Sequence, residues 1–357
     1  MQGKPLRNSR QLRKLSDESL LPPLRVLPDP VRARASRMLD TRPLADEFAI
    51  GQVGRWRVLN RFGRTSTLMD ALRLRYGQSG LGTRSDAVIH VLAGLSGMER
   101  GQYARLHTML PFTAFALSDR LRTTDHGWLA AVAKRSGRGT PRSAAYLCPA
   151  CVQEDRGYWG YSYWRRSHQL PGQLWCDKHP DESLHAVTDA QVWENLPEFW
   201  LGRGLSKGHN LSVAVRDNPY VRRFGTACQA MLDGGRSRSV TTLRRALSVR
   251  AIAAGLAING GATRRRRLSD LTRECFPTPF LQHLFPSLVN MGADDTWFFP
   301  IDAVARPTHP TPLSTGTAIA MSIFYPSISA AFEDIFRGEG EVRAKAKAVN
   351  HPHAARC

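Results

Sequence analysis

The sequence lacks any apolar run long enough to cross a lipid bilayer, which takes about 18 to 20 residues. The longest candidate, residues 318–331, is interrupted by polar residues and a proline. Residues 1–21 are basic, but they contain no apolar core of the kind that a secretory signal needs. We therefore expect a cytoplasmic protein with no membrane partner.

Cysteines and acidic residues are both scarce. Six cysteines in 357 residues are too few and too unevenly spaced for a disulfide scaffold, so a close pair of them indicates metal or redox chemistry. Lys and Arg number 50 against 30 Asp and Glu, which gives a formal net charge of +20. This excess favours a polyanionic partner, most often nucleic acid, although some basic proteins are merely soluble.

The patterning of the chain divides it into five segments, and the predicted fold class is mainly α. We expect, in order, a flexible basic arm, an N-terminal helical domain, a small zinc-binding module, a C-terminal helical domain with a candidate helix-turn-helix, and a disordered basic tail. Their expected bounds are 1–40, 41–141, 142–190, 191–340 and 341–357.

The arm carries five basic residues at about three-residue spacing, with no acidic residue before Asp17: Lys4, Arg7, Arg10, Arg13 and Lys14. On a helix these charges would share one face, which suits a phosphate backbone. A solvated tail without a specific role is an equally good interpretation.

Three stretches of the N-terminal domain have helical periodicity: 48–59, 65–76 and 85–98. The acidic pair Asp46-Glu47 precedes the first, and glycines follow the first two as stop signals. Short helices with tight turns are compatible with a helix-turn-helix-like fold, but any small helical bundle has the same pattern. Further along, aromatic residues crowd residues 158–175, and their alternation at 159, 161 and 163 predicts a strand.

Two short ligand pairs stand out in the middle of the chain. Cys148 and Cys151 form a C-x-x-C pair, Cys176 and His179 form a C-x-x-H pair, and 24 residues lie between the two pairs. Zinc prefers tetrahedral thiolate and imidazole ligands, and two such turns complete its coordination shell. Four protein ligands leave no open position, so we expect a structural Zn²⁺ rather than a catalytic one. A redox role would need only the first pair and would leave the second unexplained.

The remaining cysteines and the nearby histidine have simpler interpretations. Cys228 and Cys275 lie in apolar helical surroundings and are expected to be buried as small hydrophobic residues. His168 lies between the two ligand pairs and is a fifth ligand candidate. We favour a role in orienting the loop by hydrogen bonding, because the zinc shell is already full.

Residues 146–184 closely resemble the core of the TniQ family. The family pattern of CPxC, an acidic E-D, Y-W-R-R-x-H-Q-L-P-G and C-x-x-H stands here as Cys148–Cys151, Glu154-Asp155, Tyr163–Gly172 and Cys176–His179. Upstream, the acidic pair and the helix ending near Gly63 look like a stretched version of the family's N-terminal helix, without its Ser-Trp-Leu. Downstream, residues 277–286, Trp297 and His309-Pro310 are similar in order to longer TnsD-like members.

The resemblance implies a non-catalytic protein of cut-and-paste transposons. Such proteins recognise a target, either directly on DNA or through another targeting complex, including an RNA-guided one. They then recruit an AAA-type ATPase regulator, which delivers the transposase. A homodimer is compatible with this role, and the oligomeric state is left open by the sequence.

The strongest candidate for DNA contact is an arginine-rich stretch after the zinc module. Residues 235–267 contain nine arginines and no acidic residue. Apolar positions 243, 247, 249, 252 and 256 predict a helix that leaves Arg244, Arg245 and Arg250 outside, and a glycine turn leads to Arg264, Arg265, Arg266 and Arg267. A helix, a turn and a basic helix start fit a helix-turn-helix reader, and Arg suits contacts to phosphate and guanine. A helical hairpin with a solvated loop is the alternative.

Three residues of the motif between the ligand pairs are further candidates for contact with nucleic acid, and each has a structural role as its alternative. Trp164, Arg165 and Arg166 could present an aromatic ring and two guanidinium groups to nucleic acid, or could pack the module against a neighbouring helix. We favour packing for Trp164 and leave both roles open for Arg165 and Arg166.

Two other functions compete with a transposition adaptor. A zinc-dependent nuclease or hydrolase is disfavoured because no ligand position is open and no second cluster of His or carboxylate residues has metal spacing. A zinc-stabilised nucleic-acid-binding regulator unrelated to transposition fits the same knuckles and charge.

Overall fold

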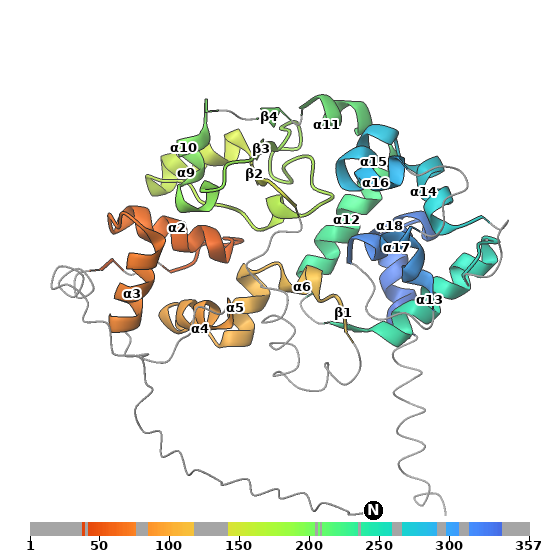
Figure 1. Ribbon diagram of the computed structural model, residues 1–357, viewed down its shortest axis with the longest axis horizontal. Coiled ribbons are helices and arrows are strands. Elements are labelled where there is room, and N and C mark those ends of the chain that lie inside the picture. Colours follow the sequence, from red (N-terminus) through yellow and green to blue (C-terminus); the bar gives the residue numbers. More distant parts are fainter. Residues whose placement is uncertain are drawn as a thin grey trace, which may run out of the picture.

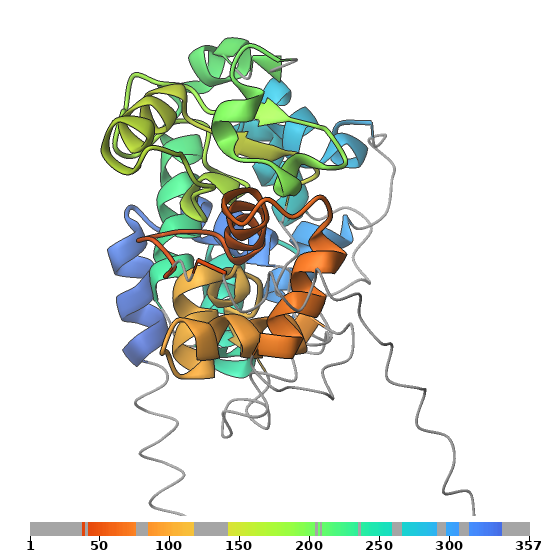
Figure 2. The same ribbon diagram turned by 90° about the vertical axis from the view of Figure 1, so that its left-hand side faces the viewer.

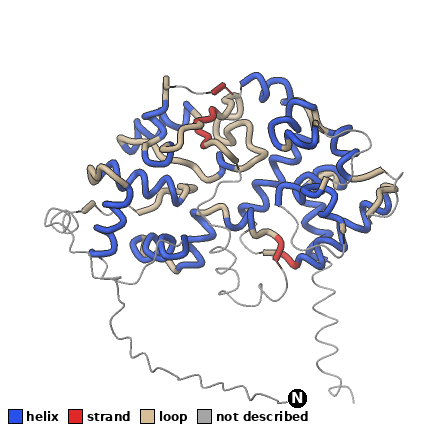
Figure 3. Tube along the Cα trace, viewed as in Figure 1, coloured by secondary structure: helices blue, strands red, loops and turns tan. Residues whose placement is uncertain are grey.

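The computed structural model describes residues 38–39, 42–75, 85–117, 142–203, 206–207, 209–234, 237–258, 266–290, 298–306 and 314–337. The described chain is mostly helical, as predicted, and its strands are all short (Figures 1 and 3). The predicted C-terminal tail and nearly all of the basic arm lie outside the described residues. Within them, no helix is long and apolar enough to span a bilayer.

The predicted N-terminal helices are confirmed. Helices α2 (Ala49–Leu59), α3 (Thr65–Arg75) and α4 (Ser85–Leu95) are followed by α5 (Arg100–His107) and the short α6 (Leu110–Thr113). Their apolar faces enclose a cluster of buried side chains that includes Trp56, Leu68, Leu72, Leu92 and Tyr103. The acidic pair before α2 does not cap it, because the N-cap residue is Phe48 and makes no side-chain cap.

The central part holds a small antiparallel sheet and helix α9. Strands β2 (Ala145–Leu147), β3 (His185–Val187) and β4 (Ser206–Lys207) lie in the order β2-β3-β4, and α9 spans Pro149–Trp159. Short turns η1 (Ser167–Gln169) and η2 (Val192–Glu194) and helix α10 (Pro197–Trp200) complete this part. Seen from the side, it covers helix α2 (Figure 2).

The predicted strand at residues 159–163 is wrong. Pro149 is preorganised for the first helical turn, so a helix starts at the first cysteine knuckle and runs to Trp159. Gly160 ends the helix in the left-handed conformation with φ 80°. The alternating aromatic residues that follow belong to a loop with separate packing partners.

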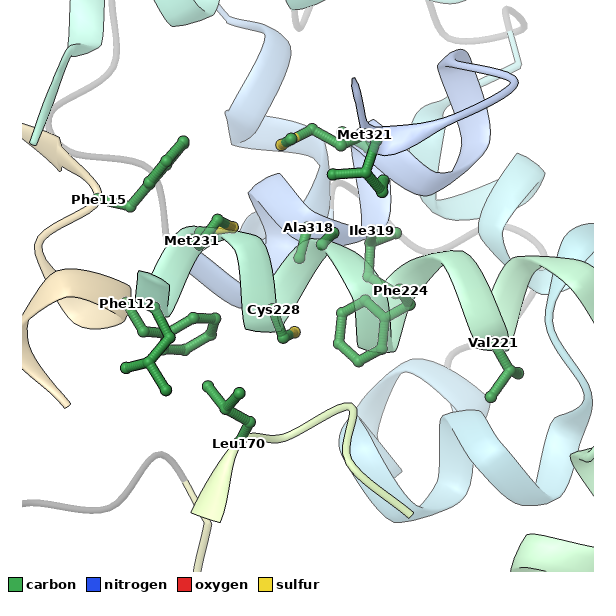
Figure 4. Close-up of a cluster of buried hydrophobic side chains, with 14 of the residues drawn as sticks. Phe112, Phe115, Leu170, Val221, Phe224, Cys228, Met231, Ala318, Ile319 and Met321 are labelled. Atoms are coloured by element: carbon green, nitrogen blue, oxygen red, sulfur yellow. The ribbon is translucent and has the colours of Figure 1, made fainter. Parts of the chain in front are cut away.

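Helix α12 (Pro219–Asp233) crosses the middle of the molecule (Figure 1) and is the axis of the main core (Figure 4). Asn218 starts it, because its side-chain oxygen accepts the N–H groups of Tyr220 and Val221 at 3.0 Å each. Around α12 lie α18 (Ser314–Phe324) on one side and Leu170 with α6 on the other. Cys228 is fully buried in this core, as predicted, whereas Cys275, for which burial was also predicted, is only partly buried against it.

The C-terminal part wraps this axis with short helices. They follow α11 (His209–Val215) and comprise α13 (Val240–Ala253), α14 (Leu268–Cys275), α15 (Thr278–Leu284), α16 (Pro286–Val289), α17 (Phe299–Asp302) and turn η3 (Ala303–Ala305), with a last helical stretch at 328–337. Strand β1 (Ala116–Leu117) pairs in parallel with β5 (Arg238–Ser239) and so joins this part to α6. One cluster of buried side chains runs from Phe48 through Trp164 to Ile335, across all three parts.

Candidate metal centre and the motif that holds it

The four predicted zinc ligands converge in the central part. Cys148 is the N-cap residue of α9, and Cys151 lies in its first turn. Cys176 and His179 lie in a turn of the chain between Trp175 and Ser183, which form an isolated antiparallel bridge. The turn is fixed by backbone hydrogen bonds from the Cys176 N–H to the Glu182 carbonyl (3.0 Å) and from the Glu182 N–H to the His179 carbonyl (2.8 Å).

The distances between the ligand atoms fit a tetrahedral metal ion. The Sγ atoms of Cys151 and Cys176 are 3.5 Å apart, and the His179 Nδ1 atom lies 3.3 Å from Cys151 Sγ and 3.6 Å from Cys148 Sγ and Cys176 Sγ. Zinc–sulfur and zinc–nitrogen bonds of about 2.3 and 2.0 to 2.1 Å give tetrahedral edges of about 3.8 Å (S–S) and 3.5 Å (S–N). The cluster therefore could hold a metal ion such as zinc, with Nδ1 as the imidazole ligand.

The charge of the cluster leads to the same conclusion. Hydrogen bonds from Cys148 and Cys151 lower the pKa of Cys176, whereas hydrogen bonding to Cys148 and Cys176 and burial raise the pKa of Cys151. Three thiolates cannot share so small a buried volume without a cation. A divalent ion at the centre would neutralise them.

A second layer of side chains orients the ligands. The Nε2 atom of His179 lies 2.9 Å from Glu154 Oε1, and this contact with Glu154 raises the pKa of His179. Glu154 also binds Lys178. His168 is buried, and its Nε2 atom lies 3.6 Å from Cys176 Sγ, which agrees with the predicted orienting role. Such outer-shell partners fix the tautomer and orientation of metal ligands.

The motif between the two knuckles joins the zinc cluster to the rest of the fold. Its backbone pairs with the acidic stretch before α2: the Phe48 N–H donates to the Trp164 carbonyl (2.8 Å), and the Arg166 N–H donates to the Asp46 carbonyl (2.7 Å). Trp164 is 1% exposed and donates its indole N–H to the Asn195 carbonyl at 2.8 Å. Packing was the predicted role of Trp164, and the structure supports it.

The rest of the motif makes equally specific contacts. Gln169 binds the strand β2 backbone at both ends of its amide, accepting from the Tyr146 N–H (2.9 Å) and donating to the Tyr146 carbonyl (2.8 Å). Leu170 is fully buried in the main core. Gly172 touches α12 so closely that a Cβ atom would lie 2.7 Å from the Phe224 ring and 3.0 Å from the Gly225 Cα.

Arg165 and Arg166 are engaged within the protein. Arg165 donates to Asp155 at 2.6 Å, with side-chain exposures of 15% and 7%. Arg166 is 6% exposed, and it contacts the Asp46 carboxylate at 3.4 Å and donates to the Arg105 carbonyl. Their burial favours the packing role over contact with nucleic acid.

The acidic pair before α2 is a second anchor of this region, which the sequence pattern did not reveal. Glu47 and Arg55 are both fully buried, and the carboxylate accepts from Arg55 Nε at 2.6 Å and from a second guanidinium nitrogen at 2.7 Å. Burial raises the pKa of Glu47, although Arg55 opposes that shift. Asp46 has a left-handed φ of 58°, and its Oδ2 accepts from the Ser167 hydroxyl at 2.5 Å.

The arginine-rich segment differs from its prediction in one respect. Arg244 was expected outside α13, but it is 7% exposed, whereas Val249 and Ile252, expected inside, are 59% and 58% exposed. The buried stripe follows positions 243, 244, 247, 248 and 251, and position 249 is turned about 200° from 247. Arg245 and Arg250 are exposed as predicted, and Arg250 pairs with Asp334 at 3.2 Å.

The second half of the predicted helix-turn-helix is only partly described. Helix α14 begins at Leu268, after the arginines, and the Arg267 N–H donates to Asp270 Oδ2 at 2.9 Å. Arg266 is exposed and pairs with Glu274. Arg264 and Arg265 lie outside the described residues. Helix α13 packs mainly on η3 and α18, and α14 packs mainly on α17 and α18.

These features define a mainly helical protein built around a small module with three cysteines and one histidine. Residues 38–180 match the TniQ family. The matched region starts before α2 and ends directly after His179. It therefore includes the acidic pair Asp46-Glu47, the motif between the two ligand pairs and all four candidate ligands. Residues 38–180 therefore form a TniQ family domain, and membership of this family implies a transposition-associated protein. A comparison with curated proteins gives no match.

Proposed function

We propose that this protein is a non-catalytic adaptor of DNA transposition. It recognises a target, either a DNA site or another targeting complex, and recruits an AAA-type ATPase regulator that delivers the transposase. The observation that supports this role is the TniQ match over residues 38–180. The matched region contains the Cys3His cluster and the backbone hydrogen bonds that join the motif to the residues before α2. The five predicted segments remain our proposal for its domain organisation.

The role of the metal in this proposal is structural. Cys148, Cys151, Cys176 and His179 would hold one Zn²⁺ ion and supply all four ligands, so the ion would stabilise the module without binding a substrate. Cys148 and Cys176 are buried, which fits a closed site. A zinc-dependent nuclease would need an open ligand position, which this donor set does not provide.

We propose that DNA contacts the C-terminal arginines that reach solvent. Arg245 and Arg266 are the first candidates, since both are exposed, and Arg250 is a third that would have to exchange Asp334 for phosphate. We also propose that Arg264, Arg265 and Arg267 contact DNA, because they are next to Arg266 in the sequence. Removing any one arginine that binds a phosphate should weaken binding about equally for all sequences and lower the salt slope by about one.

The decisive experiment reconstitutes transposition with a candidate AAA-type ATPase regulator and a candidate transposase. We expect insertions to concentrate at one target only when this protein is present, because the adaptor supplies target choice. The Cys176→Ser variant should lose that effect. Unchanged insertion frequency and distribution without the protein would refute the proposal.

A DNA-selection experiment then separates the two modes of targeting. Zinc-loaded protein selects fragments from genomic DNA at physiological salt, where phosphate attraction alone is weak. Enrichment of one site would assign target recognition to this chain. Arg245→Gln should then weaken the enrichment, whereas Arg203→Gln, at an exposed arginine outside the arginine-rich stretch, should not. Uniform recovery would assign recognition to a partner complex.

A further inference from the structure

Helix α13 has an outer face that the described part of the fold leaves uncovered. The helix lies at the edge of the molecule (Figure 1), and its contact with η3 and α18 buries the stripe that contains Leu243 and Leu247. Exposed side chains stand on the outer face at positions 241, 245, 249 and 252. At 3.6 residues per turn these positions fall within about 80° of one another, so they form one continuous face about 16 Å long.

The outer face carries apolar side chains in solvent. Val249 is 59% exposed and Ile252 is 58% exposed, and they lie one helical turn apart. Residues three positions apart are neighbours on the surface of a helix. Single exposed apolar residues are common on proteins, whereas adjacent ones rimmed by polar side chains are typical of interaction sites. The rim here comes from Thr241 and Arg245, which are both exposed on the same face.

The charge around this face identifies the kind of partner. Arg245 is exposed at its centre, while Arg250 on the flank pairs with Asp334 at 3.2 Å. Residues 235–267 contain nine arginines and no acidic residue. Such a segment complements a polyanion better than the mixed charges of a typical protein surface. The partner must therefore be anionic as a whole and must also offer apolar groups to Val249 and Ile252.

We propose that this face of α13 enters the major groove of duplex DNA, where Val249 and Ile252 contact thymine methyl groups beside a guanine bound by Arg245. The major groove is about 12 Å wide and admits an α-helix. Arg binds guanine N7 and O6 together, and apolar side chains pack on the C5 methyl of thymine. A face about 16 Å long spans about five base pairs at about 3.4 Å per pair.

This inference rests on the proposed DNA contact of Arg245 and adds the bases that the helix reads. The phosphate backbone attracts the arginines equally at every sequence. The two apolar side chains cannot bind phosphate, so their contribution depends on where thymine stands. Val249 and Ile252 are therefore specificity-determining residues, while Arg245 contributes both affinity and specificity.

The test begins with selection from random duplex DNA by the full zinc-loaded chain at physiological salt. We expect the enriched sites to combine a guanine with thymines within about five base pairs. One enriched duplex is then made with uracil in place of those thymines, which removes the C5 methyl groups and leaves the hydrogen-bonding groups and phosphates unchanged. The Kd should rise about fourfold for each contacted methyl, as expected for one buried apolar carbon group.

A double variant and two single variants assign this effect to the face. Val249→Ala with Ile252→Ala should weaken binding to the thymine duplex and should bind the thymine and uracil duplexes equally, because the methyl groups have lost their partners. Arg245→Gln should weaken binding to both duplexes. Val213→Ala, at a valine of α11 that is 56% exposed, is the control and should retain the preference for thymine. Zinc content and circular dichroism confirm that each variant folds.

Three results would overturn the inference. Equal affinity of the unmodified chain for the two duplexes, with binding still weakened by Arg245→Gln, would refute methyl reading and leave the proposed DNA contact intact. Uniform recovery of the random fragments would show that this face reads no bases and would assign target recognition to a partner complex. A double variant that loses self-association or binding to the ATPase regulator, but keeps the preference for thymine, would assign the face to a protein partner.

Discussion

The buried pair of Glu47 and Arg55 should be the most sensitive electrostatic contact in the TniQ domain. Both side chains are fully buried, and Arg55 also donates to the Arg42 carbonyl (2.9 Å) and to the Tyr161 hydroxyl (3.3 Å). Glu47→Gln keeps the size of the side chain but leaves the Arg55 charge without its counter-ion. Removing one member of a buried pair typically costs about 3 to 5 kcal/mol, which is a large share of a total stability of about 5 to 15 kcal/mol.

The double variant distinguishes charge pairing from simple loss of packing. Arg55→Met should cost a similar amount, because it leaves Glu47 charged and buried. Glu47→Gln with Arg55→Met removes both charges, so its cost should fall about 3 kcal/mol short of the sum of the single variants. Asp181→Asn, at an exposed ion pair with Arg216, serves as the control and should change stability by less than about 0.5 kcal/mol.

The assay is urea unfolding of the zinc-loaded chain at pH 7, followed by circular dichroism. An osmolyte such as trimethylamine N-oxide keeps the single variants folded if they are too unstable in buffer. Additive effects in the double variant, or a Glu47→Gln cost below about 1 kcal/mol, would refute the assignment of this pair as a buried, coupled ion pair.

Three further predictions concern packing, pH and metal. Gly54→Ala should destabilise the protein by about 1 to 3 kcal/mol, because its Cβ would lie 2.0 Å from the Trp193 carbonyl oxygen, whereas Gly94→Ala has open space and should gain up to about 1 kcal/mol in urea unfolding. Stability should fall as the pH drops from 6.5 towards 4, since burial lowers the folded-state pKa of His283 to about 4, so the unfolded chain binds more protons there. His283→Gln should flatten that pH profile, and a profile unchanged by the substitution would contradict this assignment. Chelation of the metal should unfold the central module and lower the midpoint of thermal unfolding, and a midpoint that does not respond to chelator would argue against a structural ion.

Local patterns in the sequence predicted much of this fold and site. The ligand pairs Cys148/Cys151 and Cys176/His179 each lie within a single turn, so their spacing alone indicates a shared site. Helices such as α2 follow apolar periodicity and end at glycine or asparagine signals. These features depend on residues that are close in the chain, which is why they can be predicted without tertiary contacts.

The features that the sequence did not predict depend on distant partners. Asp46 looks like a helix-start residue, yet its carboxylate binds Ser167, which lies 121 positions away. His107 is one more helical residue in the sequence, and only the fold reveals that its ring is buried, with Nδ1 3.0 Å from the Glu47 carbonyl oxygen. Arg244 follows the charge pattern of a surface residue, but the core around α18 and η3 determines which face of α13 is buried.

The central claim is that a structural metal ion organises the TniQ domain through three cysteines and one histidine. X-ray absorption spectroscopy at the zinc edge, combined with metal analysis of the purified chain, tests it most directly. We predict one zinc per chain with three sulfur ligands at about 2.3 Å and one nitrogen at about 2.0 to 2.1 Å, and loss of a sulfur in Cys176→Ser. A chain that folds without metal, or a shell with oxygen ligands and an open position, would contradict the account.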